Sequence, residues 1–140
     1  MHDTYENTVR FAEVDVQGVV FYGNYVTFQD EAFTEYLGAL DTEFGQLHYA
    51  DWDVRVVHVE LDYRSSAQFR DDLVNAVRID SFGRSSIEVA YECRRAADDT
   101  VLVEGSVVYV AIDEEGEPMP VPKDFREAVR TFTDEPPATA

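Results

Sequence analysis

One stretch of helical periodicity followed by a series of strand-like segments constrains the fold of this chain more than any other feature. From Asn24 to Leu37 apolar residues recur at helical spacing and acidic residues fall largely on the opposite side, which predicts an amphipathic helix of about three to four turns. Asn24 is the expected N-cap, and the helix is expected to end near Gly38. A single amphipathic helix has to bury its apolar side against a sheet.

The rest of the periodic chain predicts that sheet. Five segments have the patterning of strands: residues 4–12, 54–63, 73–82, 86–95 and 101–112. Short connections at 83–85 and 97–99 favour antiparallel pairing. The continuous apolar run 107–112 predicts a central strand buried on both faces, and residues 122–132 predict a short final helix with proline near its start. The fold class is therefore α+β, an antiparallel five-stranded sheet wrapped around one long central helix.

Nothing in the pattern divides the chain into separate units. Residues 1–132 are expected to form a single domain, and residues 133–140, T-D-E-P-P-A-T-A, a flexible tail. Cys93 is the only cysteine, so no intrachain disulfide can form and a reducing compartment is expected. No apolar run is long enough to span a bilayer, and the first residues lack a signal-peptide pattern. We expect a cytoplasmic protein.

The charge balance is strongly acidic. The chain has 29 acidic and 11 basic residues, a net charge of −18, and Lys123 is its only lysine. This balance argues against nucleic-acid binding and against docking on anionic membranes. Salt screens the self-repulsion of such a chain, so the composition favours a halophilic protein, with an acidic protein of an ordinary cytoplasm as the alternative.

Several families of sites have no support in the sequence. The phosphate-binding, dinucleotide-binding and serine-elbow motifs are absent. The three histidines, His2, His48 and His58, are too scattered for a metal site, so no metal is expected. Cys93 has the pattern of a small core residue rather than that of a nucleophile.

The informative stretch is a carboxylate in a loop that leads into the predicted helix. Asp15 has apolar neighbours and can act as a nucleophile or as a general base on water, or it can simply close a turn. The apolar run 19–22 leads to a helix N-terminus, where free N–H groups can hold a developing oxyanion. A carboxylate and an oxyanion hole are the minimal equipment for acyl transfer.

Two segments carry a resemblance to a known family. Residues 15–25, D-V-Q-G-V-V-F-Y-G-N-Y, resemble the signature D-x-x-G-[VI]-V-[FWY]-[YH]-x-N-Y of hotdog-fold acyl-CoA thioesterases of the 4-hydroxybenzoyl-CoA thioesterase type. Residues 63–73, Y-R-S-S-A-Q-F-R-D-D-L, resemble that family's Y-x-x-P-A-x-x-x-D-x-L, with Ser66 in the place of its proline. The resemblance extends over nearly the whole chain and implies the hotdog fold.

The resemblance also implies roles for individual residues. Asp15 would be the catalytic carboxylate, and the backbone N–H of Tyr22 or Gly23 would polarise the thioester carbonyl. Many relatives have histidine at position 22, so a mechanism that needs an imidazole is not implied. The residues implied to shape the loop and bind the substrate are Gln17, Gly18, Asn24 and Tyr25.

The turn G-R-S-S at 83–86 matches the family's nucleotide-contacting segment. Its implied coenzyme A ligands are Arg84, Ser85 and Ser86. One arginine and two hydroxyls suit a phosphate, although an ordinary turn with a solvated arginine is an equal alternative. Arg64 and Arg70 are weaker candidates. No cofactor is expected beyond coenzyme A as part of the substrate.

The resulting hypothesis is that the protein hydrolyses a small aromatic or short-chain acyl-CoA. The resemblance also implies a homodimer or homotetramer, and a one-layer sheet with an exposed edge favours such assembly. One alternative is a binding module for CoA esters or acyl carriers that does not hydrolyse them. Others are a plain structural oligomer and a hydratase or dehydratase. The last generally needs a histidine near the helix start, but none lies between His2 and His48.

Overall fold

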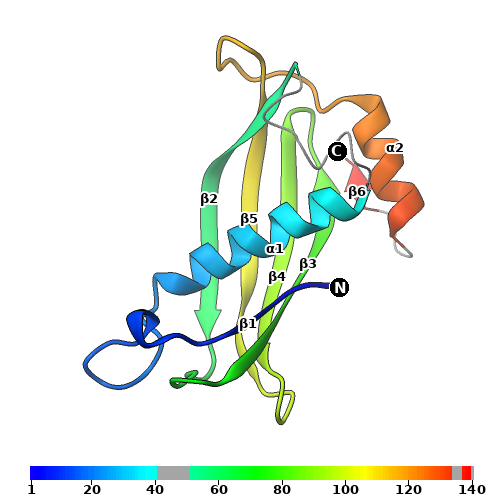
Figure 1. Cartoon of the computed structure of the whole chain (residues 1–140). Helices are drawn as coiled ribbons and strands as arrows, with labels where there is room; N and C mark the ends of the chain where they lie inside the picture. The colour runs from blue at the N-terminus through cyan, green and yellow to red at the C-terminus, as the bar shows by residue number, and fades with distance from the viewer. Residues whose placement is uncertain (41–50, 134–136, 140) are drawn as a thin grey trace.

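The computed structural model describes residues 1–40, 51–133 and 137–139. A twisted sheet carries one helix across its face, and a second, shorter helix lies near one end of the sheet (Figure 1). The elements in chain order are β1 (His2–Thr8), the 3-10 turn η1 (Phe11–Glu13), α1 (Asn24–Leu40), β2 (Asp53–Tyr63), β3 (Asp72–Phe82), β4 (Ser86–Arg95), β5 (Val101–Ile112), α2 (Lys123–Phe132) and β6 (Ala138–Thr139).

The five long strands form an antiparallel sheet in the order β1-β3-β4-β5-β2. The α+β class and the antiparallel sheet are therefore as predicted. The short strand β6 adds parallel pairing to the end of β3, through Ser81 with Ala138 and Phe82 with Thr139. Residues 134–136 and 140 of the expected flexible tail lie outside the described residues.

The first strand ends earlier than its alternating pattern predicts. Residues 4–12 were expected to be extended, whereas β1 ends at Thr8. The reason is a tight turn that follows, in which the carboxylate of Glu13 accepts a hydrogen bond of 2.8 Å from the backbone N–H of Arg10. This turn closes η1 and directs the chain away from the sheet.

Helix α1 begins at Asn24, as predicted, and ends two residues beyond Gly38, near the predicted end. It has 17 residues and continues to Leu40, because a glycine inside a helix costs only about 1 kcal/mol. The side chains that it buries are Tyr25, Phe28, Gln29, Ala32, Phe33, Tyr36 and Leu37. The apolar members of this set form the core that joins the helix to the sheet, and the buried Gln29 donates to the hydroxyl of Tyr109.

Strand β5 is covered on one face only, so the prediction of burial on both faces is wrong. Val107, Tyr109 and Ala111 are buried, whereas the alternate residues Val108 and Val110 are half-buried. The alternation follows from a helix that packs on one side of the sheet. Within the described part of the chain, no helix is long and apolar enough to cross a membrane.

Candidate active site

A tight turn positions Asp15 in the loop between η1 and α1. The backbone N–H of Asp15 donates to the carbonyl of Val19 at 2.9 Å, and the N–H of Gly18 donates to the carbonyl of Asp15 at 3.0 Å. Gly18 takes a left-handed conformation with φ of +79°, which glycine adopts without steric cost. The half-buried Asp15 carboxylate accepts a bond of 2.8 Å from the N–H of Gln17 through Oδ1. Its Oδ2 has no hydrogen-bond partner among the described residues.

The start of α1 leaves two consecutive backbone donors free. The N–H of Phe21 donates to the carbonyl of Glu13, and the N–H of Asn24 donates to the carbonyl of Phe21, both at 2.9 Å. Between them, the N–H groups of Tyr22 and Gly23 have no acceptor among the residues that the structure describes. Asn24 fixes this geometry, because its side-chain Nδ2 donates to the carbonyl of Glu13 at 2.9 Å. Such free donors at a helix N-terminus suit an anionic oxygen.

Aromatic side chains surround these donors. The hydroxyl of Tyr63, the last residue of β2, donates to the carbonyl of Tyr22 at 3.1 Å, and the two rings are perpendicular. Burial raises the pKa of Tyr63, so its hydroxyl keeps the proton that it donates. Tyr22 is 65% exposed and is therefore accessible to a ligand.

Tyr25, predicted to bind substrate, lies in the core behind the loop. It is 2% exposed, and its ring meets that of Phe28 edge-on. Burial raises the pKa of Tyr25 to about 12, so the hydroxyl is neutral at physiological pH. This hydroxyl accepts a bond of 3.4 Å from the N–H of Ala67.

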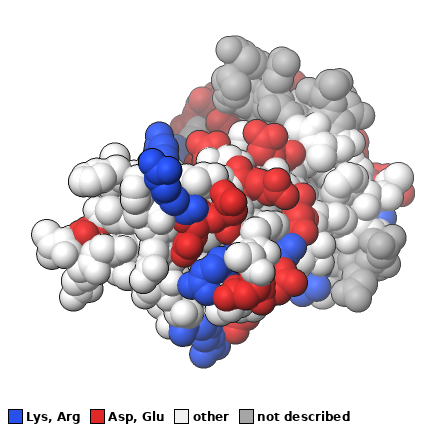
Figure 2. Space-filling view, turned by 60° about the horizontal axis from the view of Figure 1, so that its bottom comes forward, with Lys and Arg blue, Asp and Glu red and all other residues white. Residues whose placement is uncertain are grey.

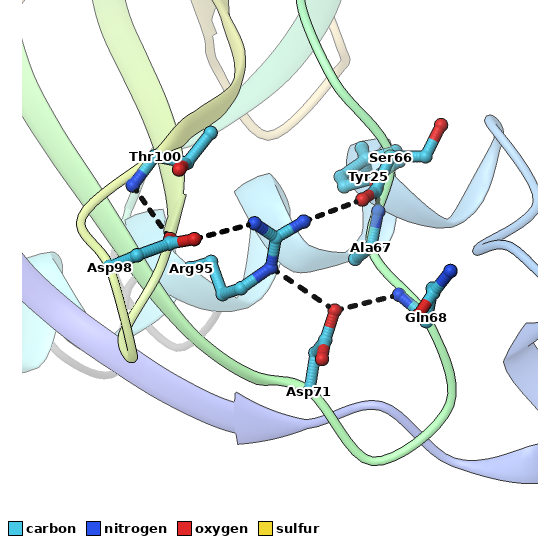
Figure 3. A network of polar contacts seen from close by, with 8 residues as sticks. All are labelled: Tyr25, Ser66, Ala67, Gln68, Asp71, Arg95, Asp98 and Thr100. Carbon is cyan, nitrogen blue, oxygen red and sulfur yellow. Dashed lines mark hydrogen bonds and ion pairs between the residues drawn. The ribbon is translucent and has the colours of Figure 1, made fainter.

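An arginine clamps the segment that lies against the Asp15 loop (Figure 3). Arg95, at the end of β4, contacts Oδ2 of Asp71 through Nε at 3.3 Å and Oδ2 of Asp98 through Nη1 at 3.0 Å. Its Nη2 donates to the carbonyl of Ser66 at 2.9 Å. The same Asp71 oxygen accepts the N–H of Gln68 at 2.8 Å. The guanidinium thus fixes both ends of the segment from Ser66 to Asp71.

This clamped segment supports the Asp15 loop directly. The N–H of Val20 donates to the carbonyl of Ala67 at 2.9 Å, and Val19 forms an antiparallel bridge with Gln68. A continuous series of contacts therefore leads from Arg95 to the turn that holds Asp15. Glu13 anchors the other side of the loop, since its carboxylate is held by Arg10.

The structure does not bring the predicted coenzyme A turn to this site within one chain. The Asp15 loop lies beside the start of β3, whereas residues 83–86 follow its end. At about 3.3 Å per residue, the eleven residues of β3 separate the two by roughly 33 Å. Arg84 is exposed, and its Nη1 donates to the hydroxyl of Ser85 at 3.2 Å.

Glu13, Tyr63 and Arg95 were not predicted from the sequence to be site residues. The spacing of Arg10 and Glu13 is that of a capping box, so Glu13 had a local signal. Tyr63 begins the family-like segment 63–73, but its contact with Tyr22 and the contacts of Arg95 join residues far apart in sequence, which no local pattern reveals. Among the described residues, no group of three or more His, Cys, Asp or Glu side chains is placed to hold a metal ion.

Comparison with known families decides the assignment. The model of the Thioesterase superfamily matches residues 17–102, which is more than half of the chain. The chain belongs to the thioesterase superfamily. This membership confirms the family that the two sequence segments indicated. No curated protein sequence matches the chain significantly.

Solved structures show the same fold over almost the whole chain. A 1,4-dihydroxy-2-naphthoyl-CoA thioesterase from Synechocystis is 23% identical with a TM-score of 0.80, covering 94% of this chain and 97% of that one. A thioesterase complexed with coenzyme A and Zn from Thermus thermophilus is also 23% identical, with a TM-score of 0.83 and 94% of each chain covered. The probable thioesterase YbaW from Escherichia coli is 21% identical with a TM-score of 0.80, covering 91% and 96%. Together these likenesses show a common hotdog fold.

Proposed function

We propose that this member of the thioesterase superfamily hydrolyses a small aromatic or short-chain acyl-CoA to the free acid and coenzyme A. The observation that carries the proposal is the placement of the Asp15 carboxylate in the loop that ends at two free backbone donors, those of Tyr22 and Gly23. A nucleophile or base beside an oxyanion hole is the arrangement that acyl transfer requires.

In the proposed mechanism the thioester carbonyl oxygen accepts hydrogen bonds from the N–H groups of Tyr22 and Gly23. Asp15 then attacks the carbonyl carbon through Oδ2, the C–S bond breaks and the CoA thiolate leaves; water hydrolyses the resulting anhydride. Alternatively, Asp15 takes a proton from a water molecule that attacks the same carbon, with the same leaving group. In both routes the negative charge that develops on the carbonyl oxygen faces the helix N-terminus, where the dipole stabilises it.

The roles of the neighbouring residues follow from their contacts. Gln17 and Gly18 hold the turn that presents Asp15, and Asn24 holds the helix start. The exposed rings of Phe21 and Tyr22 lie next to the free donors and suit an aryl group. Support for an aromatic acyl-CoA also comes from solved structures, which include a 1,4-dihydroxy-2-naphthoyl-CoA thioesterase and a gentisyl-coenzyme A thioesterase.

The proposed enzyme is a homo-oligomer that works in a salt-rich cytoplasm. Strand β2 is a sheet edge, and four of its apolar side chains are exposed: Val56, Val57, Val59 and Tyr63. A long exposed apolar edge favours pairing with a second copy. The net charge of −18 supports the halophilic assignment, because salt screens the self-repulsion. Light scattering in low and high KCl tests whether the protein is a homo-oligomer and whether its assembly depends on salt.

The proposal is tested by thiol release from a panel of aromatic and short-chain acyl-CoA esters in multimolar KCl. We expect turnover on at least one member, with equal amounts of thiol and free acid. Calorimetric titration of the same esters distinguishes the alternative on this fold. Tight binding of an ester without release of thiol by the folded protein would replace hydrolysis with a CoA-ester or acyl-carrier binding module.

A further inference from the structure

Among the residues that the structure describes, Glu13 is the only buried carboxylic acid, with an exposure of 9%. The other described acidic residues are exposed or half-buried. In Figure 2, which looks towards the Asp15 end, acidic side chains lie over the body of the molecule beside a largely uncharged lobe that projects at the left. Removal of a carboxylate from water is costly, so the burial of Glu13 needs an explanation other than the acidic surplus of the chain.

Both the side chain and the backbone of Glu13 hold other parts of the loop. Its carboxylate accepts the backbone N–H of Arg10 at 2.8 Å through Oε1 and the guanidinium of Arg10 at 3.0 Å through Oε2. Its carbonyl accepts two further bonds, both of 2.9 Å, from the N–H of Phe21 and from Nδ2 of Asn24. One residue is thus tied to three other positions of the chain.

Glu13 and Phe21 close the base of a short hairpin, which an antiparallel bridge and a further hydrogen bond hold together nearer its tip. One arm of this hairpin carries Asp15, two residues after Glu13. The other arm leads through Phe21 directly to the free N–H groups of Tyr22 and Gly23. The contacts of Glu13 therefore join the arm that carries the carboxylate to the arm that leads to the donors.

We propose that Glu13 is a positioning residue that fixes the distance between Asp15 and the two oxyanion donors. This inference rests on the proposed function and adds to the reacting groups the residue that holds them in place. The donors lie between Phe21 and Asn24, and both of these residues donate to the Glu13 carbonyl. A shift of that carbonyl would move the donors relative to Asp15, and a misplacement of about 1 Å near a reacting centre can cost about 10²-fold in rate.

The test removes the two hydrogen bonds of the carboxylate with Glu13→Ala. We expect kcat on the acyl-CoA ester that the wild type hydrolyses fastest to fall by roughly 10- to 10²-fold. KM should change little, because Glu13 is buried and touches no part of the bound ester in the proposed mechanism.

Asp113→Ala is the matched control. Asp113 closes a tight turn after β5, at the end of the sheet that carries residues 83–86, where its Oδ1 accepts the N–H groups of Glu115 and Glu117 at 2.9 and 3.0 Å. This variant also loses two hydrogen bonds between a carboxylate and its own loop, but at the end remote from Asp15. It should keep the wild-type kcat.

Two measurements distinguish positioning from general stability. The infrared carbonyl stretch of a bound ketone analogue of an acyl-CoA should lie at a lower frequency in the wild type than in Glu13→Ala, because the donors polarise the carbonyl. Asp113→Ala should give the wild-type frequency. Amide hydrogen exchange needs no ligand, and the N–H groups of Asp15 and Phe21 should exchange faster in Glu13→Ala but not in Asp113→Ala.

Glu13→Gln is a milder variant, since it keeps an oxygen for the N–H of Arg10 and loses only the ionic contact with the guanidinium. It should lower kcat less than Glu13→Ala and speed the exchange of the same two amides, so the inference is tested even where Glu13→Ala does not fold.

A wild type that hydrolyses no ester contradicts the proposed function, while amide exchange still decides whether Glu13 holds the hairpin. The inference is overturned if folded Glu13→Ala keeps the wild-type kcat or if Asp113→Ala loses as much kcat. A carbonyl frequency and amide exchange rates that do not respond to the loss of Glu13 would overturn it as well.

Discussion

The two ends of the sheet use the same kinds of residue in opposite ways. At the end that carries residues 83–86, Arg126 donates to the carbonyls of Gly83 and Arg84 and lies over the ring of Phe82 at 4.9 Å. Its hydrogen bonds and ring contact are thus used inside the fold. At the Asp15 end, two consecutive backbone donors have no acceptor among the described residues, and aromatic rings beside them are exposed. Backbone donors left without acceptors, rather than the presence of arginine or aromatic residues, distinguish the Asp15 end from the other end.

The largest expected effect on turnover comes from Asp15→Asn. The asparagine keeps a carbonyl oxygen for the N–H of Gln17, so the turn survives while the nucleophile or base is lost. We expect kcat to fall about 10²–10⁴-fold with an unchanged melting temperature, measured by thiol release and thermal unfolding. Activity within tenfold of wild type would remove Asp15 from the chemistry.

The second-largest effect is expected from the contacts by which Arg95 clamps the segment that supports the Asp15 loop. Arg95 and Arg94 are adjacent and their side chains are equally exposed, at 22%, but Arg94 binds Asp3 on β1 rather than the clamped segment. We expect Arg95→Gln to lower kcat by up to about 10²-fold, since small misplacements near a reacting centre have effects of that size. Arg94→Gln should leave kcat unchanged.

Amide hydrogen exchange adds a structural readout for the same pair of variants. The N–H of Val20, which donates to Ala67, should exchange faster in Arg95→Gln and not in Arg94→Gln. Equal kcat losses in both variants would mean that the clamp acts only through general stability.

A smaller effect is expected for Tyr63→Phe. The variant loses the hydroxyl that donates to the carbonyl of Tyr22 at 3.1 Å and keeps the ring. One hydrogen bond of this kind is worth about 1 kcal/mol, so kcat should fall about fivefold at most while KM changes little. Steady-state kinetics on a CoA ester measure both constants, and an unchanged kcat would show that Tyr63 does not hold the oxyanion donors.

At the end of the sheet that carries residues 83–86, a core substitution is expected to lower the stability of the fold without changing turnover. Phe125 of α2 is fully buried and packs against Trp52 and Phe82. Phe125→Ala should lower the free energy of unfolding by about 3–5 kcal/mol and leave kcat intact where the protein is folded. Urea unfolding followed by thiol release measures both, and a large kcat loss in the folded variant would contradict the separation of the two ends.

Local patterns in the sequence predicted what is local in the structure. The bounds of β4 and β5 and the start of α1 agree with the periodicity, because each depends on neighbouring residues. Asp15 and the helix start were linked for the same reason, since one short loop joins them. The Arg95 clamp joins residues that are 24 and 29 positions apart, and no spacing rule detects such a contact. The distance of Arg84 from Asp15 depends on the direction and length of β3, which the matched motif does not contain.

The assignment of the chemistry to the Asp15 end is tested most directly by the crystal structure of the protein with a ketone analogue of an acyl-CoA, in which a methylene group replaces the thioester sulfur. The analogue keeps the carbonyl and cannot be hydrolysed at sulfur. We predict that its carbonyl oxygen lies about 2.7–3.1 Å from the N–H nitrogen of Tyr22 or Gly23, with the Asp15 carboxylate facing the carbonyl carbon. A carbonyl bound away from these groups, for example beside residues 83–86, would contradict the assignment of the chemistry to the Asp15 end.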